Sequence, residues 1–124
     1  MSKILIVDDE KKIREIYGKL LALEGYTVVE AEDVQTAARF LVHDESIKLV
    51  LLDINIPQVD WGILYRLIRM LDAKIRVIVT SAYPMEDQKQ KIVKADDYYE
   101  KSQGMDLLLE KVKAVVKKEG EYAY

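Results

Sequence analysis

Acidic, hydroxyl and ammonium side chains follow four apolar segments of this 124-residue chain, at the point where each segment ends. Asp8 and Asp9 follow the first segment, Asp53 the third, Thr80 the fourth and Lys101 the fifth. If these segments are strands of one parallel sheet, their carboxyl ends share the edge at which open α/β sheets bind ligands. Three carboxylates brought together at that edge repel one another unless a cation compensates their charge.

A divalent cation with oxygen ligands is the natural compensation, and Mg²⁺ typically takes one or two carboxylates and keeps several waters. A hydroxyl and an ammonium group opposite the ion make a pocket for an oxyanion. The set therefore predicts phosphoryl chemistry, with Asp53 as nucleophile and with Thr80 and Lys101 stabilising the phosphoryl group. Each residue alone has a more ordinary explanation, such as a helix cap for Asp8, but the ordered combination favours a functional site.

The elements that must position these side chains alternate along the chain as strand and helix, five times over. Residues 49–52 are an unbroken apolar run, which is typical of a strand buried on both faces. The other expected strands cover Lys3–Val7, 26–31, 75–79 and 96–100. This alternation predicts an α/β fold with a single doubly wound parallel sheet and helices on both faces.

Helices are expected after each strand. Apolar residues recur at helical spacing from position 13 to 21, and Gly25 suits the C-terminal cap of that helix. Asp33 and Asp60 can cap the second and third helices. The fourth helix, at 85–94, has few apolar residues to bury, and the fifth covers 105–118 before a frayed tail.

Composition narrows the functional classes. The net charge of −3 gives no basic face for direct nucleic-acid binding, and the absence of cysteine excludes disulfides and zinc–thiolate sites. No apolar run approaches the roughly 20 residues of a membrane helix, and the N-terminus does not resemble a signal peptide. We therefore expect one globular domain in the cytoplasm, without membrane contact.

Four motifs, ILIVDDE, LVLLDINIP, VIVTSAY and DDYYEKS, occur in the same order as in the receiver domains of two-component response regulators, which the chain resembles over nearly its whole length. The resemblance implies a flavodoxin-like fold with five helices and a five-stranded sheet in the order 2-1-3-4-5. The receiver would occupy residues 1–120, with a frayed tail at 121–124.

The resemblance also implies that Asp53 accepts a phosphoryl group from the phosphohistidine of a sensor kinase or a histidine phosphotransfer protein. Mg²⁺ or Mn²⁺ would be bound by the carboxylates of Asp9 and Asp53, by Asp8 largely through water, and by the backbone carbonyl of Asn55. The only catalysis expected is self-phosphorylation and self-dephosphorylation, so the protein is not expected to be an enzyme in the usual sense.

By the same resemblance, Thr80 would bond a phosphoryl oxygen and Lys101 would pair with the phosphoryl charge. Thr80 would move on phosphorylation, and the aromatic ring of Tyr98 would turn inward behind it. This movement would change a face made by the fourth helix, fifth strand and fifth helix, which a separate output protein binds. Tyr99, beside Tyr98, could compete for the same role.

Three positions depart from the family pattern, and one of them is Lys94, where the family usually has glycine before the fifth strand. Ser102 follows Lys101 where the family usually has proline after a cis peptide bond, so we expect either a trans bond with a rerouted loop or a strained cis bond. Trp61 stands where the family usually has glycine, which predicts a reshaped start of the third helix.

Two other interpretations remain open from the sequence. A degenerate receiver would bind partners independently of phosphorylation, and the departures at Ser102 and Trp61 permit it. A phosphatase of the haloacid dehalogenase type also uses a strand-end aspartate with Mg²⁺, but it needs an acid two residues later, where this chain has Asn55.

Overall fold

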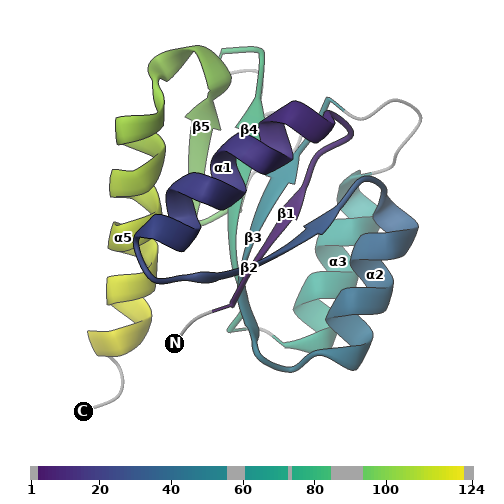
Figure 1. Ribbon diagram of the computed structural model, residues 1–124. Coiled ribbons are helices and arrows are strands. Elements are labelled where there is room, and N and C mark those ends of the chain that lie inside the picture. Colours follow the sequence, from purple (N-terminus) through teal and green to yellow (C-terminus); the bar gives the residue numbers. More distant parts are fainter. Residues whose placement is uncertain (1–2, 56–60, 73, 85–93, 122–124) are drawn as a thin grey trace.

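The computed structural model describes residues 3–55, 61–72, 74–84 and 94–121, which build a five-stranded parallel sheet flanked by helices (Figure 1). The strands are β1 (Lys3–Val7), β2 (Thr27–Ala31), β3 (Ile47–Asp53), β4 (Arg76–Ser81) and β5 (Asp97–Glu100). Their order is β2-β1-β3-β4-β5, and each neighbouring pair runs parallel. The predicted fold class and strand order are confirmed.

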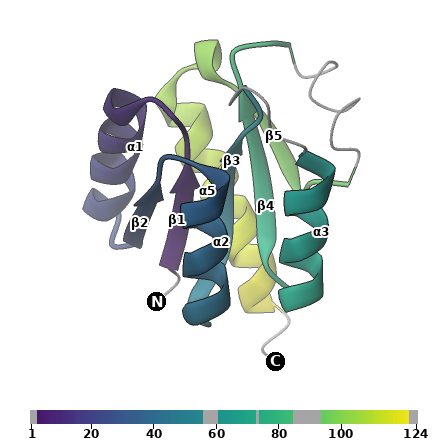
Figure 2. The same ribbon diagram turned by 90° about the vertical axis from the view of Figure 1, so that its right-hand side faces the viewer.

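The helices lie on both faces of the sheet. They are α1 (Lys11–Leu23), α2 (Val34–His43), α3 (Trp61–Leu71) and α5 (Met105–Glu121). Helices α1 and α5 cover one face, and α2 and α3 cover the other (Figure 2). The helix expected at 85–94 falls, up to position 93, on residues that the structure does not describe. None of the helices in the described ranges has the length and apolar character needed to cross a bilayer.

The apolar faces of the helices form two cores, one on each side of the sheet. On one side, α1 and α5 contribute the buried side chains of Tyr17, Leu21, Leu108, Val112 and Val115. On the other side, α2 and α3 contribute Ala37, Leu41, Leu64 and Ile68. The spacing of three or four residues within each helix puts these side chains on one face, as the sequence pattern predicted.

Strand β3 separates the two cores and contributes to both. Leu49 and Leu51 pack against α1 and α5, whereas Val50 and Leu52 pack on the side of α2 and α3. All four are at most 1% exposed. The alternation follows from the two-residue period of a strand, and burial on both faces explains why the run has no polar interruption.

Two predicted helix caps are confirmed. The carboxylate of Asp33 accepts a hydrogen bond of 2.7 Å from the backbone N–H of Thr36, in the first turn of α2. Gly25, at φ 92°, follows the end of α1 and donates its N–H to the Ala22 carbonyl at 3.0 Å. The proposed cap Asp60 lies outside the described residues, and α3 begins at Trp61.

Strand register brings the polar strand ends to one edge of the sheet. Asp53 is the register partner of Thr80, and Thr80 is the partner of Tyr99. Asp8 directly follows Val7, which pairs with Leu52. Because every strand points the same way, these residues meet at the carboxyl edge.

The segment after β5 resolves the alternatives stated for Ser102. The described part of the chain contains no cis peptide bond, so the Lys101–Ser102 bond is trans. Lys101–Gln103 forms a short 3₁₀ helix, η1, and Gly104 follows at φ 91° before α5 begins. The loop is therefore rerouted through a tight turn that ends in glycine.

Alanine substitution is expected to lower the free energy of unfolding at a buried position of α3 and to leave it nearly unchanged at an exposed one. Ile68 is fully buried, whereas Met70, two residues later in α3, is 84% exposed. Ile68→Ala should lower the free energy of unfolding by about 2–5 kcal/mol because it leaves a cavity. Met70→Ala is the matched control and should change it by less than about 0.5 kcal/mol in urea unfolding. Similar losses for the two variants would contradict this packing of α3.

Candidate functional site

Two buried carboxylates share one ammonium group at the carboxyl edge of the sheet. Lys101 Nζ lies 2.8 Å from Asp8 Oδ2 and 3.4 Å from Asp53 Oδ2. Asp8 and Asp53 are each 1% exposed, and the Lys101 side chain is 13% exposed. Three residues that lie far apart in the sequence, on different strand ends, are thus brought together as the sequence predicted.

The backbone after β1 holds Asp8 in place. Its carboxylate accepts a hydrogen bond of 2.9 Å from the backbone N–H of Glu10, and its own N–H donates to Ala31. Arg14, one turn into α1, donates from Nη1 to the Asp8 carbonyl at 2.7 Å. Sequence reasoning did not identify Arg14, because its role depends on how α1 turns back over β1.

Asp9 is exposed beside Asp8, and carboxylate oxygens of Asp8, Asp9 and Glu10 all lie within 4.8 Å of one another. These hard oxygen donors match the chemistry of Mg²⁺ or Mn²⁺. The single ammonium of Lys101 cannot balance the charge of Asp8, Asp9 and Asp53 together. The donor set therefore fits a divalent cation, and Glu10 joins the acids that sequence reasoning placed there.

The environment of Asp53 disfavours its charged form. Burial raises the pKa of its carboxyl group from 3.8 to about 6. A hydrogen bond of 2.9 Å from the backbone N–H of Asn55 opposes the rise, the negative charge of Asp8 adds to it, and Lys101 again opposes it. Asp53 is thus a poorly compensated buried acid, to which any additional cation should be attracted.

Lys101 keeps its charge despite being half-buried. Burial alone would lower the pKa of its ammonium group, but the hydrogen bond to Asp8 and the charges of Asp53 and Asp8 raise the pKa above its ordinary value. The group is therefore a permanent cation opposite the acids.

Thr80 and Asn55 connect β3 with β4 at the site. Thr80 is 2% exposed and its carbonyl accepts the N–H of Ile54 at 3.1 Å. Asn55 Oδ1 accepts hydrogen bonds from Ser81 Oγ at 3.1 Å and from the Ala82 N–H at 2.8 Å. Sequence reasoning did not predict these side-chain bonds of Asn55 and did not identify Ser81, because the bonds depend on how the two loops face each other.

Tyr98 and Tyr99 point to opposite faces of β5. Tyr98 is 7% exposed and packs in the core on the side of α2 and α3, whereas Tyr99 is fully buried in the core under α1 and α5. The two rings therefore do not compete for one position, which separates the roles that the sequence left open.

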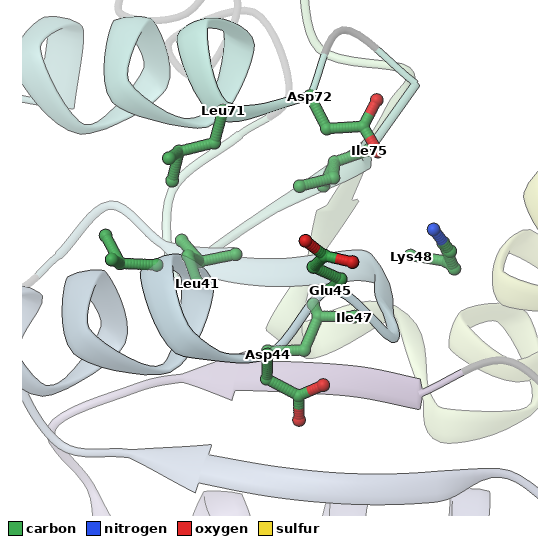
Figure 3. Close-up of a pocket in the computed structure, with 9 residues that line it drawn as sticks. Leu41, Asp44, Glu45, Ile47, Lys48, Leu71, Asp72 and Ile75 are labelled. Carbon is green, nitrogen blue, oxygen red and sulfur yellow. The ribbon is translucent and has the colours of Figure 1, made fainter.

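Other polar features lie away from this edge. His43 is exposed in the last turn of α2. A pocket of about 340 Å³ opens at the opposite edge of the sheet, where Asp44, Lys48 and Asp72 lie near the starts of β3 and β4 (Figure 3). It includes none of the predicted site residues.

The sequence profile of the response regulator receiver domain matches residues 4–113 of this chain. The chain belongs to the response regulator receiver domain family. The structure of the response regulator protein TrrA from Thermotoga maritima, in complex with Mg²⁺–BeF, superposes with a TM-score of 0.80 at 34% identity, covering 93% of this chain and 99% of that one.

Curated relatives agree with this assignment. The phosphate regulon transcriptional regulatory protein PhoB of Pseudomonas aeruginosa is 37% identical over 121 residues, which are 94% of this chain and 52% of that protein. Sporulation initiation phosphotransferase F of Bacillus subtilis is 34% identical over 113 residues, which are 90% of each. The receiver chain spans about half the length of several regulators that it matches, and nearly the full length of the phosphotransferase.

Replacement of Asp53 in the receiver is expected to stabilise the metal-free fold. Because the pKa of Asp53 is raised in the folded state, its ionised form is penalised there. The penalty is absent below the ordinary pKa of 3.8, grows as the pH rises toward about 6, and is fully present above it. Asp53→Asn should therefore raise the free energy of unfolding at pH 7 by on the order of 2 kcal/mol.

Thermal melts in a chelator between pH 4 and pH 8 measure this effect. Asp9→Asn is the matched control, since it removes a charge from the same edge at an exposed position. Its melting temperature should stay close to that of wild type. An Asp53→Asn variant that is less stable than wild type at pH 7 would contradict the penalty assigned to Asp53.

Proposed function

We propose that Asp53 accepts a phosphoryl group from a phosphohistidine on a sensor kinase or a histidine phosphotransfer protein. The observation that carries this proposal is the pair of buried carboxylates, Asp8 and Asp53, that face one ammonium group at a strand edge. Such a pair lowers the stability of the fold, because one ion pair rarely offsets the full cost of burying charge. Its presence therefore supports a role in binding or chemistry. The Mg²⁺–BeF complex of the TrrA relative supports the same chemistry.

Mg²⁺ or Mn²⁺ would be held by Asp8, Asp9, Asp53 and the backbone carbonyl of Asn55. Asp9 is the exposed member of the set, so it offers the ion an approach from solvent. When bound, the ion supplies positive charge that offsets the negative charge of the acids and of the incoming phosphoryl group. Glu10, whose carboxylate lies within the same cluster, adds to the negative field that attracts the ion.

The residues of the receiver would carry out the transfer as follows. A carboxylate oxygen of Asp53 forms a bond to phosphorus while the phosphorus–nitrogen bond of the phosphohistidine breaks, and the imidazole leaves with the electron pair and takes up a proton from solvent. The backbone N–H of Asn55 holds Asp53 Oδ1 and orients the carboxylate. Lys101 exchanges its carboxylate partners for the phosphoryl oxygens, and the Thr80 hydroxyl donates to one of them.

The acyl phosphate at Asp53 is then removed by water, and no other reaction is proposed. The partners would be proteins, namely the phosphodonor and an output target, with no direct contact to nucleic acid or membrane. The proposed receiver unit spans residues 1–120, with a short tail at 121–124, and it would act in the cytoplasm. The names of the relatives, which include regulators and a phosphotransferase, support a place in a phosphorylation cascade.

The output would depend on Thr80 and Tyr98. Thr80 is the next-to-last residue of β4 and pairs with Asp53, and Tyr98 lies on the neighbouring strand β5 against Val79, its register partner. Movement of the Thr80 hydroxyl toward the phosphoryl group changes the space next to the Tyr98 ring. That change would reach the surface through β5 and α5.

Phosphoryl uptake by Asp53 is testable with acetyl phosphate and Mg²⁺. Wild type is expected to gain the mass of one phosphoryl group, with release of acetate, and Asp53→Asn to gain none, because the nucleophilic oxygen is lost. Asp72→Asn, at the opposite edge of the sheet, is the matched control and should behave as wild type. Equal labelling of Asp53→Asn, or labelling that persists in a chelator, would contradict the proposal.

The switch is testable with beryllofluoride, a phosphoryl mimic. Addition with Mg²⁺ should shift the NMR signals of Thr80, Tyr98 and the residues of β5 in wild type and leave them unchanged in Asp53→Ala. A receiver that works independently of phosphorylation would instead give no shift in wild type, or the same shift in both proteins.

A further inference from the structure

Two buried tyrosines, Tyr17 and Tyr99, pack against each other in the core under α1 and α5. Tyr17, from α1, is 4% exposed and Tyr99, from β5, is fully buried. Their rings meet edge to face, with centroids 6.4 Å apart and planes at 75°. The Tyr99 hydroxyl donates a hydrogen bond of 2.8 Å to the Gly104 carbonyl.

Gly104 is the end of the turn that carries Lys101. The turn begins at Glu100, where the Glu100 backbone N–H donates to the Gln103 side chain at 3.0 Å. It ends at Gly104, which is exposed, has φ 91°, and has no heavy atom of the described residues within 4 Å of the place where a Cβ would stand. Packing around the Gly104 α-carbon therefore does little to hold it, and the Tyr99 hydroxyl supplies an anchor from below.

The Lys101–Gly104 turn must be held in place because its position sets the position of the Lys101 ammonium. A lysine side chain loses much rotamer freedom when it is fixed, and the Lys101 ammonium must face Asp8 at 2.8 Å and Asp53 at 3.4 Å. Ser102 has no ring to restrict its backbone, in contrast to proline. A backbone that shifts by a fraction of an ångström at this turn would carry the ammonium with it.

We propose that the Tyr99 hydroxyl, on a ring that packs against Tyr17, is a positioning group that fixes the Lys101–Gly104 turn and so places the Lys101 ammonium for phosphoryl transfer. This inference rests on the proposed function of Asp53. A ring that only filled the core would not need its hydroxyl, and a buried hydroxyl is a cost unless it finds partners. The Tyr99 hydroxyl finds its partner in the Gly104 carbonyl, in the turn after Lys101.

Tyr99→Phe removes the hydroxyl and keeps the ring. We expect its rate of phosphoryl uptake from acetyl phosphate, at saturating Mg²⁺, to fall about two- to tenfold, the range of one net hydrogen bond. The affinity for Mg²⁺, measured by calorimetry, should stay within about twofold of wild type, because the turn contributes none of the acids. Tyr26→Phe is the matched control, since Tyr26 is partly buried against the same core, and should match wild type.

A double-mutant cycle separates positioning from general stability. If Tyr99 acts through Lys101, Tyr99→Phe should have no further effect on uptake in a Lys101→Ala background. A merely structural effect would instead lower uptake by the same factor in both backgrounds, and that result would overturn the inference. Unchanged uptake in the single Tyr99→Phe variant would overturn it as well.

A second readout does not require phosphorylation. In metal-free wild type, the ¹⁵N signal of the Lys101 ammonium should be protected from exchange with water by its pairing with Asp8. We expect Tyr99→Phe to broaden this signal and Tyr26→Phe to leave it sharp. If wild type took up no phosphoryl group, the proposed function would fail, and this measurement would still decide whether Tyr99 positions Lys101. Equal signals in both variants would count against the inference.

Discussion

The structure depends on one electrostatic constraint, which is that two carboxylates are buried at neighbouring strand ends with a single ammonium group between them. Burial of a charged group is costly, and an ion pair in the interior rarely repays that cost in full. The fold meets the constraint with backbone donors from Glu10 and Asn55 to the two acids and with Lys101 opposite them. Parallel register of β1, β3 and β4 keeps the acids close in spite of their repulsion.

The same constraint explains why Lys101 could exchange one ionic partner for another at this site. Lys101 contacts both acids, yet the pKa of Asp53 remains raised, so the compensation is incomplete. A cation that joined the acids would free Lys101 to meet another anion, and a phosphoryl group at Asp53 would be such an anion. The incompletely compensated acids would therefore lower the stability of the fold while favouring the proposed reaction. Charged groups with shifted pKa values are common at functional sites.

Much of the fold follows from local patterns in the sequence. Strand β1 has the predicted bounds, and Asp33 and Gly25 cap the helices that were expected, because these features depend on period and on residue type within a few positions. The contacts that sequence reasoning missed join elements that lie far apart in the chain. Arg14 to Asp8, Ser81 to Asn55 and Tyr99 to Gly104 depend on helix rotation and loop path, which no local pattern encodes.

The alternation of side chains along a strand assigns the adjacent tyrosines of β5, Tyr98 and Tyr99, to opposite faces of the sheet. Successive side chains of a strand point to opposite faces, so Tyr98 and Tyr99 cannot serve the same core. Tyr98 faces α2 and α3 and adjoins the β4 residue before Thr80, whereas Tyr99 faces α1 and reaches the turn after Lys101. One strand thus contacts both groups that would meet a phosphoryl oxygen. Because Thr80 pairs with Tyr99 and Lys101 directly follows β5, a small shift of β5 would alter both at once, which gives the strand a direct physical route from the site to the surface.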